Sequence, residues 1–198
     1  MLTVAGAGEL RWLDGRVGDA TTDGSQLQMI APRSSDWFND PMGPTRHSSA
    51  PALVFEPDGD FQLSARASVE FENAFDAAVL FVHRTNDDFA KLCFEYSPDH
   101  HPMVVSVVTR EVSDDANGPV VEGWTVWLRV SRIGATYAFH HSLDGHHWLM
   151  TRLFALRDGS PLASVGFVAQ SPTGDSCTVR FDDVTYRRAT LTDVRDGT

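Results

Sequence analysis

The sequence predicts an all-β protein folded as a two-sheet sandwich of the jelly-roll type. Helical periodicity is almost absent, because no window of about 11 residues has an apolar stripe at helical spacing free of Gly, Pro or Asp. Short strand-like runs occur instead along the whole chain, and turn signals such as Asp144-Gly145 separate them. Many strands with hairpin-length connections are typical of sandwiches and exclude a β/α protein.

The expected strands have alternating or continuous apolar patterns, and they are residues 10–13, 27–30, 52–55, 61–71, 77–84, 89–96, 103–112, 124–133, 136–142, 148–156, 164–169 and 177–187. The turn signals between them are residues 58–60, 86–87, 97–99, 117–119, 133–134, 144–145, 158–159 and 173–175. Residues 33–51, with three prolines, are expected to form a long loop. Long strands with one polar face predict a curved sandwich with a concave polar face.

The strand 89–96 has the most unusual polar face. Leu92 and Phe94 fall on one side, whereas Lys91, Cys93 and Glu95 fall on the other. Lys91 is the only lysine in the chain. An ammonium and a carboxylate on one strand face indicate either a salt bridge or the floor of a polar pocket.

Composition limits the domain count and the partners. The 198 residues fit a single domain, residues 1–198, with about eight N-terminal and ten C-terminal residues expected to fray. A net charge of -11 excludes nucleic acid and anionic membranes as partners, because their phosphates would be repelled. No export signal and no long apolar span is present, which favours the cytoplasm. Cys93 and Cys177 are expected to be buried free thiols.

A candidate ligand site follows if the strands 89–96, 103–112 and 124–133 are neighbours. Lys91, Glu95, Thr109, Trp127 and Arg129 would then converge on one surface. Proteins hold sugars by stacking aromatic rings on C–H faces and by pairing hydroxyls with fixed polar groups. The alternative is a ladder of cross-strand salt bridges on a solvated sheet face.

The paired histidines and the turn at residues 142–148 are interpreted as structural. The turn approaches the Asp-box of propeller glycosidases but is one residue short, so a hairpin turn covered by Trp148 is favoured. The pairs His100-His101, His140-His141 and His146-His147 are expected at surface turns, and no metal or cofactor is expected.

Catalytic motifs are not found. Glycoside hydrolysis needs two carboxylates, and Glu95 has no second carboxylate on its own strand. The sequence therefore favours a non-catalytic protein, and Glu95 is the candidate general base if the protein is an enzyme.

Several phrases in order resemble one family: DW at residues 36–37, FDAAVLFV at 75–82, KLCFE at 91–95, VVT at 107–109, LRVSR at 128–132, SLDG at 142–145 and QSP at 170–172. Together they resemble the concanavalin A-like domains of unknown function that include the yeast regulator of enolase, kin to accessory domains of β-xylosidases. The chain departs where the family commonly reads Tyr-Asp-Gln-Ala-Gly, having Phe75-Asp76-Ala77-Ala78-Val79.

The resemblance implies a concanavalin A-like sandwich whose concave face binds carbohydrate, and it adds Asp36 and Trp37 to the expected ligand-binding residues. The first hypothesis is lectin-like, non-catalytic binding of a small saccharide or sugar derivative. The alternatives are a regulatory domain that binds a metabolic enzyme, and a hydrolase or lyase acting on a sugar compound.

Overall fold

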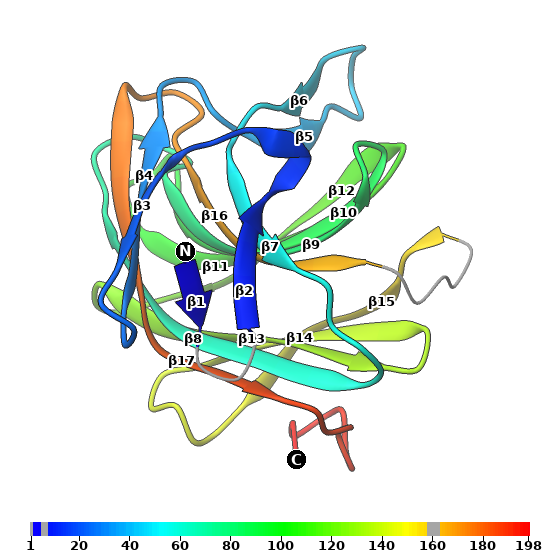
Figure 1. Cartoon of the computed structure of the whole chain (residues 1–198). Helices are drawn as coiled ribbons and strands as arrows, with labels where there is room; N and C mark the ends of the chain where they lie inside the picture. Colours follow the sequence, from blue (N-terminus) through cyan, green and yellow to red (C-terminus); the bar gives the residue numbers. More distant parts are fainter. Residues whose placement is uncertain (1, 5–7, 158–162) are drawn as a thin grey trace.

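The protein is a sandwich of two large antiparallel sheets, as a computed structural model that describes residues 2–4, 8–157 and 163–198 shows (Figure 1). The predicted all-β, concanavalin A-like fold class is confirmed. No helix among the described residues is long and apolar enough to cross a membrane.

The first sheet has eight strands in the order β1-β2-β7-β16-β9-β10-β11-β12. Their bounds are β1 Leu2–Val4, β2 Gly8–Trp12, β7 Ala52–Phe55, β16 Ser164–Gln170, β9 Ala77–Thr85, β10 Asp88–Tyr96, β11 Pro102–Arg110 and β12 Val112–Val120. The predicted hairpin is β9–β10, and it lies inside this sheet between β16 and β11.

The second sheet has seven strands in the order β15-β14-β13-β8-β17-β4-β3. Their bounds are β15 Leu149–Ala155, β14 Thr136–Ser142, β13 Thr125–Ile133, β8 Phe61–Glu70, β17 Ser176–Arg187, β4 Leu27–Pro32 and β3 Asp19–Thr22. A two-stranded hairpin, β5 Trp37–Asn39 with β6 Arg46–Ser48, and a short 3-10 turn, η1 Leu13–Gly15, complete the fold. Figure 1 shows the hairpin on the side of the eight-stranded sheet, away from the second sheet.

Two apolar clusters explain why some strands alternate apolar and polar residues whereas others are apolar at almost every position. The main core lies between the sheets, where β8 buries Phe61, Leu63 and alternate residues after them. A second cluster covers the outer face of the eight-stranded sheet, and Trp37 of β5 lies in it against Phe81 and Phe89. Strand β9 is therefore buried on both faces, which accounts for its continuous apolar run.

The structure differs from the prediction at several places, and β1 and β3 are strands that the sequence pattern did not predict. Residues 33–51 are not only a loop, because they contain β5 and β6. The expected turn at residues 117–119 lies inside β12, and the chain reverses earlier, at Glu111, which has a φ of 76°. Pro119 is tolerated because β12 is an edge strand.

The C-terminal tail, which was expected to fray, makes specific contacts with the sheet. Leu191 is buried, and the tail lies against the outer face of the seven-stranded sheet. The Gly197 carbonyl accepts a hydrogen bond of 2.8 Å from Arg129, and the Val194 carbonyl lies 2.8 Å from the His140 ring. The predicted N-terminal fraying concerns in part residues 1 and 5–7, which lie outside the described residues, as does the expected turn at 158–159. Cys93 and Cys177 are buried and free, as predicted.

Candidate functional site

A pocket lined by both polar and apolar side chains opens on the outer face of the eight-stranded sheet, beside the β5–β6 hairpin. Its volume is about 470 Å³, which is within the range of small-molecule sites. Strands β10, β11 and β12 contribute Lys91, Glu95, Val107 and Asp115. The remaining lining residues come from the hairpin region, the end of β16 and two loops, and they are Ser34, Asp36, Phe38, His47, Phe75, Gln170, Pro172 and Thr173.

Lys91 forms the centre of the pocket. Its Nζ donates to Asp36 Oδ1 and to Gln170 Oε1, each at 3.0 Å, and the residue is 2% exposed. Burial disfavours the ammonium, but the carboxylates of Asp36 and Glu95 outweigh it, and the net effect raises the pKa of Lys91. A charge this deeply buried excludes the solvated salt-bridge ladder for Lys91.

Glu95 lies half-buried on the same face of β10 as Lys91, two positions along that face. Burial raises the pKa of Glu95 to about 8, with Asp115 and Asp36 adding to the shift and Lys91 opposing it. Asp115 lies at the rim on β12, opposite Val107 of β11. Partial burial raises the pKa of Asp115 as well, and the negative charge of Asp36 adds to this shift. The folded environment therefore favours the protonated form of Glu95.

A buried hydrogen-bond network fixes the wall next to Lys91. Gln170, which accepts from Lys91, donates from its Nε2 to the Phe75 carbonyl at 3.3 Å. The next residue, Ser171, donates to Asp76 Oδ1 at 2.7 Å, and Asp76 also accepts two backbone N–H groups. These contacts hold Phe75 at the rim with a φ of 71°.

Trp37 and Thr109, both expected to contact ligand, do not line the pocket. Trp37 is 1% exposed, and its ring donates to the Ala50 carbonyl at 2.7 Å. Thr109 is fully buried and lies 2.8 Å from the Ser113 hydroxyl, which accepts from the Asn39 backbone. Both residues anchor the β5–β6 hairpin to the sheet, so they position the pocket wall and do not face a ligand.

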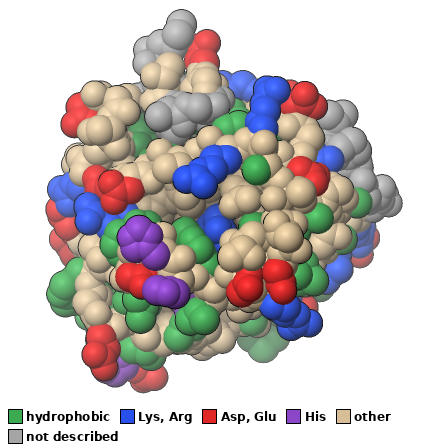
Figure 2. Space-filling model, turned by 90° about the horizontal axis from the view of Figure 1, so that it is seen from below, with side chains coloured by type: hydrophobic (Ala, Val, Ile, Leu, Met, Phe, Trp, Pro, Cys, Tyr) green, Lys and Arg blue, Asp and Glu red, His purple; other side chains and the backbone are tan. Residues whose placement is uncertain are grey.

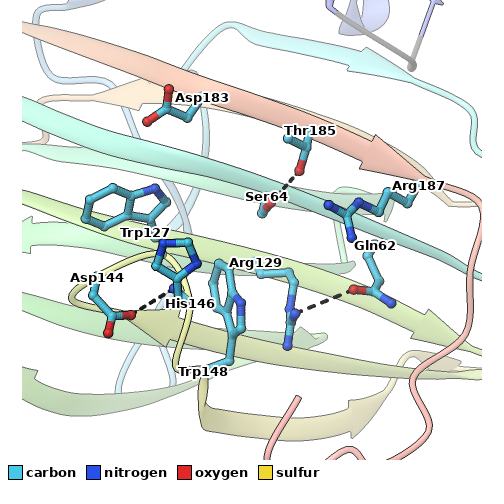
Figure 3. Close-up of a pocket in the computed structure, with 11 residues that line it drawn as sticks. Gln62, Ser64, Trp127, Arg129, Asp144, His146, Trp148, Asp183, Thr185 and Arg187 are labelled. Carbon is cyan, nitrogen blue, oxygen red and sulfur yellow. Dashed lines mark hydrogen bonds between the residues drawn. The ribbon is translucent and has the colours of Figure 1, made fainter. Parts of the chain in front are cut away.

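Trp127 and Arg129 lie on the opposite side of the molecule. The expected adjacency of the three strands is wrong, because β13 pairs with β8 and β14 in the seven-stranded sheet. The chain passes from one sheet to the other between β12 and β13. Trp127 and Arg129 line a separate hollow there, on the face seen in Figure 2 and enlarged in Figure 3.

Several pocket residues escaped the analysis of the sequence: Asp115, Gln170, Phe38, Phe75 and His47. Gln170 belongs to one of the phrases that carried the family resemblance, so a signal for it existed. Asp115 had none, because β12 resembles a turn-rich loop with its Asp, Asn, Gly and Pro residues.

The prediction that the paired histidines are surface turn residues is wrong for His140 and His141. Both are buried in β14. Because adjacent residues on a strand point to opposite faces of the sheet, the two rings have different partners. His140 contacts the tail, whereas His141 Nδ1 lies 2.9 Å from the Thr151 hydroxyl. Within the described residues, no three His, Cys, Asp or Glu side chains are grouped as a metal site would require.

The family resemblance is confirmed by a direct comparison. A family profile described as "Protein of unknown function (DUF1349)" matches residues 16–189. The chain belongs to the DUF1349 family. No curated protein sequence gives a significant match.

Solved structures show how widely the DUF1349 fold is shared. A functionally unknown protein from Saccharomyces cerevisiae is 23% identical with a TM-score of 0.81, covering 90% of this chain and 95% of that one. The GH43 protein BlXynB from Bacillus licheniformis is 15% identical with a TM-score of 0.69, and the match covers 88% of this chain but 36% of that one. The alginate lyase from Klebsiella pneumoniae is 12% identical with a TM-score of 0.55, covering 85% and 83%. The fold thus resembles β-sandwich domains of sugar-active proteins.

Proposed function

We propose that the pocket around Lys91 binds a small saccharide or sugar derivative without transforming it. The observation that carries this proposal is the buried ammonium of Lys91, fixed by Asp36 and Gln170, beside the half-buried Glu95. A rigid set of charged donors and acceptors recognises hydroxyl groups strongly because such hydrogen bonds are charge-assisted.

The apolar part of the pocket supports the same ligand class. Phe38 and Phe75 are accessible to solvent at the lining, and Val107 and Pro172 add apolar surface. Sugars present apolar C–H faces as well as hydroxyls, so a site of mixed character suits them better than it suits an ion or a lipid. The sugar-active structural neighbours are consistent with this ligand class, although they establish the fold alone.

A second candidate function is acid–base catalysis on a sugar compound. One observation favours it: a pKa of about 8 lets Glu95 keep a proton at neutral pH. Glu95 would then act as a general acid, in place of the general base expected from the sequence, and Asp36 or Asp115 would supply the second carboxylate.

The test is calorimetric titration of the folded protein with neutral mono- and disaccharides, including xylose and xylobiose. The double variant Lys91→Met, Asp36→Asn should lose binding while keeping its fold, since it removes both charges of the buried ion pair and strands neither. Its matched control is Arg33→Met, Asp175→Asn, which removes an exposed pair with side chains 77% and 86% accessible and should bind like the wild type.

Each outcome decides between the functions. Binding without loss of the sugar supports the lectin-like function, whereas appearance of reducing ends or unsaturated products supports the enzyme. No binding to the panel, or equal binding by the Lys91 double variant, contradicts the proposal. Co-purification of a metabolic enzyme in the absence of any sugar binding would favour the regulatory alternative.

A further inference from the structure

A second hollow lies on the outer face of the seven-stranded sheet, opposite the pocket of Lys91. Its volume is about 520 Å³, and β8, β13 and β17 form its floor. Basic, acidic and histidine side chains all lie on this face (Figure 2), and the hollow is lined by two arginines, two aspartates and a histidine. Trp127 and Arg129 were expected to contact ligand, but beside Lys91; the other residues of this hollow come from strands and a turn that are distant in the chain and were not predicted.

Two arginines in this hollow have no carboxylate partner among the described residues. Arg129 is 5% exposed; its Nη2 donates to the Gly197 carbonyl, its Nη1 reaches Gln62 only at 3.5 Å, and its Nε has no partner. Arg187 is exposed on β17. Burial of Arg129, and to a smaller extent the positive charge of Arg187, lowers the pKa of Arg129 to about 10. Two like charges left unpaired in one hollow favour an anionic ligand.

The acidic side chains at the same hollow are already engaged. Asp144 accepts the backbone N–H groups of His146 and His147 at 2.8 Å and the His147 ring at 2.7 Å. Asp183 lies 3.8 Å from the Arg66 guanidinium. Asp144 is thus held by its own turn and Asp183 lies near Arg66, and neither carboxylate forms an ion pair with Arg129 or Arg187 among the described residues.

Two indole rings provide apolar walls. Trp148 stacks on Arg129, whose guanidinium carbon lies 4.2 Å from the ring centroid. Trp127 lies beside the turn at Gly145, whose φ of 77° lets the turn approach the ring closely. Figure 3 shows both rings at the hollow, with the side chains of Arg129 and Arg187 directed toward Gln62.

Neutral hydrogen-bonding groups complete the floor. Ser64 and Thr185 face each other across β8 and β17 with 2.8 Å between their hydroxyl oxygens. Indole rings suit the C–H faces of a sugar, hydroxyl and amide groups suit its hydroxyls, and guanidinium groups suit a carboxylate. We propose that this hollow is a second binding site, for a carboxylate-bearing saccharide.

The test uses digalacturonate and dimannuronate as probes, with the methyl ester of each as the neutral match. Binding is followed by calorimetry and by tryptophan fluorescence, because Trp127 and Trp148 line the site. We expect each acid to bind about tenfold more tightly than its ester, which corresponds to one charge-assisted hydrogen bond.

Arg187→Gln should weaken binding of the acids about tenfold and leave the esters unchanged, because it removes one guanidinium partner. The matched control is Arg188→Gln, which makes the same change at the next, exposed position, outside the lining of the hollow. It should bind like the wild type.

The two pockets are distinguished by the variant Lys91→Met, Asp36→Asn, which removes the ion pair of the first pocket and should bind the acids like the wild type. Loss of binding in that variant would move the uronate to the other face and overturn the proposal. No binding of either acid, equal affinity for acid and ester, or an unchanged affinity in Arg187→Gln would also overturn it. Acid and ester are also compared in that variant, whose Lys91 pocket should no longer bind, so that the comparison reports on the second hollow whether or not the first pocket binds a neutral sugar.

Discussion

The ammonium of Lys91 lies 3.0 Å from the carboxylate of Asp36, although 55 residues separate them in the chain. Lys91 belongs to an inner strand of the eight-stranded sheet, whereas Asp36 comes from the segment that leads into β5. The pair therefore joins the hairpin to the sheet and shapes the pocket at the same time.

Removal of the ammonium should destabilise the protein. Lys91→Met leaves the Asp36 carboxylate without its cation, and we expect a loss of about 1–3 kcal/mol in the free energy of unfolding. Adding Asp36→Asn should restore part of this loss, because the stranded carboxylate is gone. Urea denaturation of the single and double variants measures the coupling.

The control for this change is Arg33→Met in the exposed pair with Asp175, where the loss should stay below about 0.5 kcal/mol. If Lys91→Met lowers the free energy of unfolding as little as Arg33→Met does, a buried ion pair between Lys91 and Asp36 is contradicted.

The protonation of Glu95 predicts a pH-dependent stability. A carboxyl group with a folded pKa of about 8, against an ordinary value of 4.5, binds its proton more tightly in the folded state. The resulting stabilisation is complete below pH 4.5 and is lost as the pH rises through 8. The free energy of unfolding of the wild type should therefore fall relative to Glu95→Gln over this window.

Chemical denaturation of both proteins at intervals from about pH 4 to 9 measures this difference. A constant difference across the range would show that Glu95 titrates as an ordinary exposed carboxyl group.

Trp37 is expected to act through packing and not through ligand contact. Trp37→Phe removes the hydrogen bond to the Ala50 carbonyl and part of a buried ring, and should lower the free energy of unfolding by about 1–3 kcal/mol. Any sugar that the wild type binds should keep its affinity within about twofold, since Trp37 does not line the pocket. A selective loss of affinity without loss of stability would place Trp37 in contact with ligand.

Gly166 is expected to be indispensable to the eight-stranded sheet. A Cβ at this position would collide with the Leu53 carbonyl and would lie 2.8 Å from Val54 Cα, both in the backbone of β7. Gly166→Ala should lower the free energy of unfolding by more than about 2 kcal/mol.

Gly43→Ala is the control, because its nearest neighbour is the Asp40 side chain in an exposed loop. Its effect should stay within about 0.5 kcal/mol. Equal midpoints in urea for the two variants would contradict the close approach of β7 to β16.

Local pattern was sufficient for the fold class. The absence of helical periodicity and the spacing of turn signals depend on residues that are close in the chain, and most of the strands lie near their expected positions. The prediction failed for β12, whose Asp, Asn, Gly and Pro residues resemble a loop, and for β5 and β6, which are held by tertiary contacts of Trp37 and Asn39.

The local pattern of the sequence predicted only part of the candidate site. Alternation along β10 placed Lys91 and Glu95 on one face, because side chains of a strand alternate whatever the rest of the chain does. Which sheet each strand joins was decided by long-range pairing, and this separated Trp127 and Arg129 from Lys91 by the thickness of the sandwich. It also brought Asp36, Asp115 and Gln170 to the pocket from three distant segments, where burial of a single ammonium requires their polar groups.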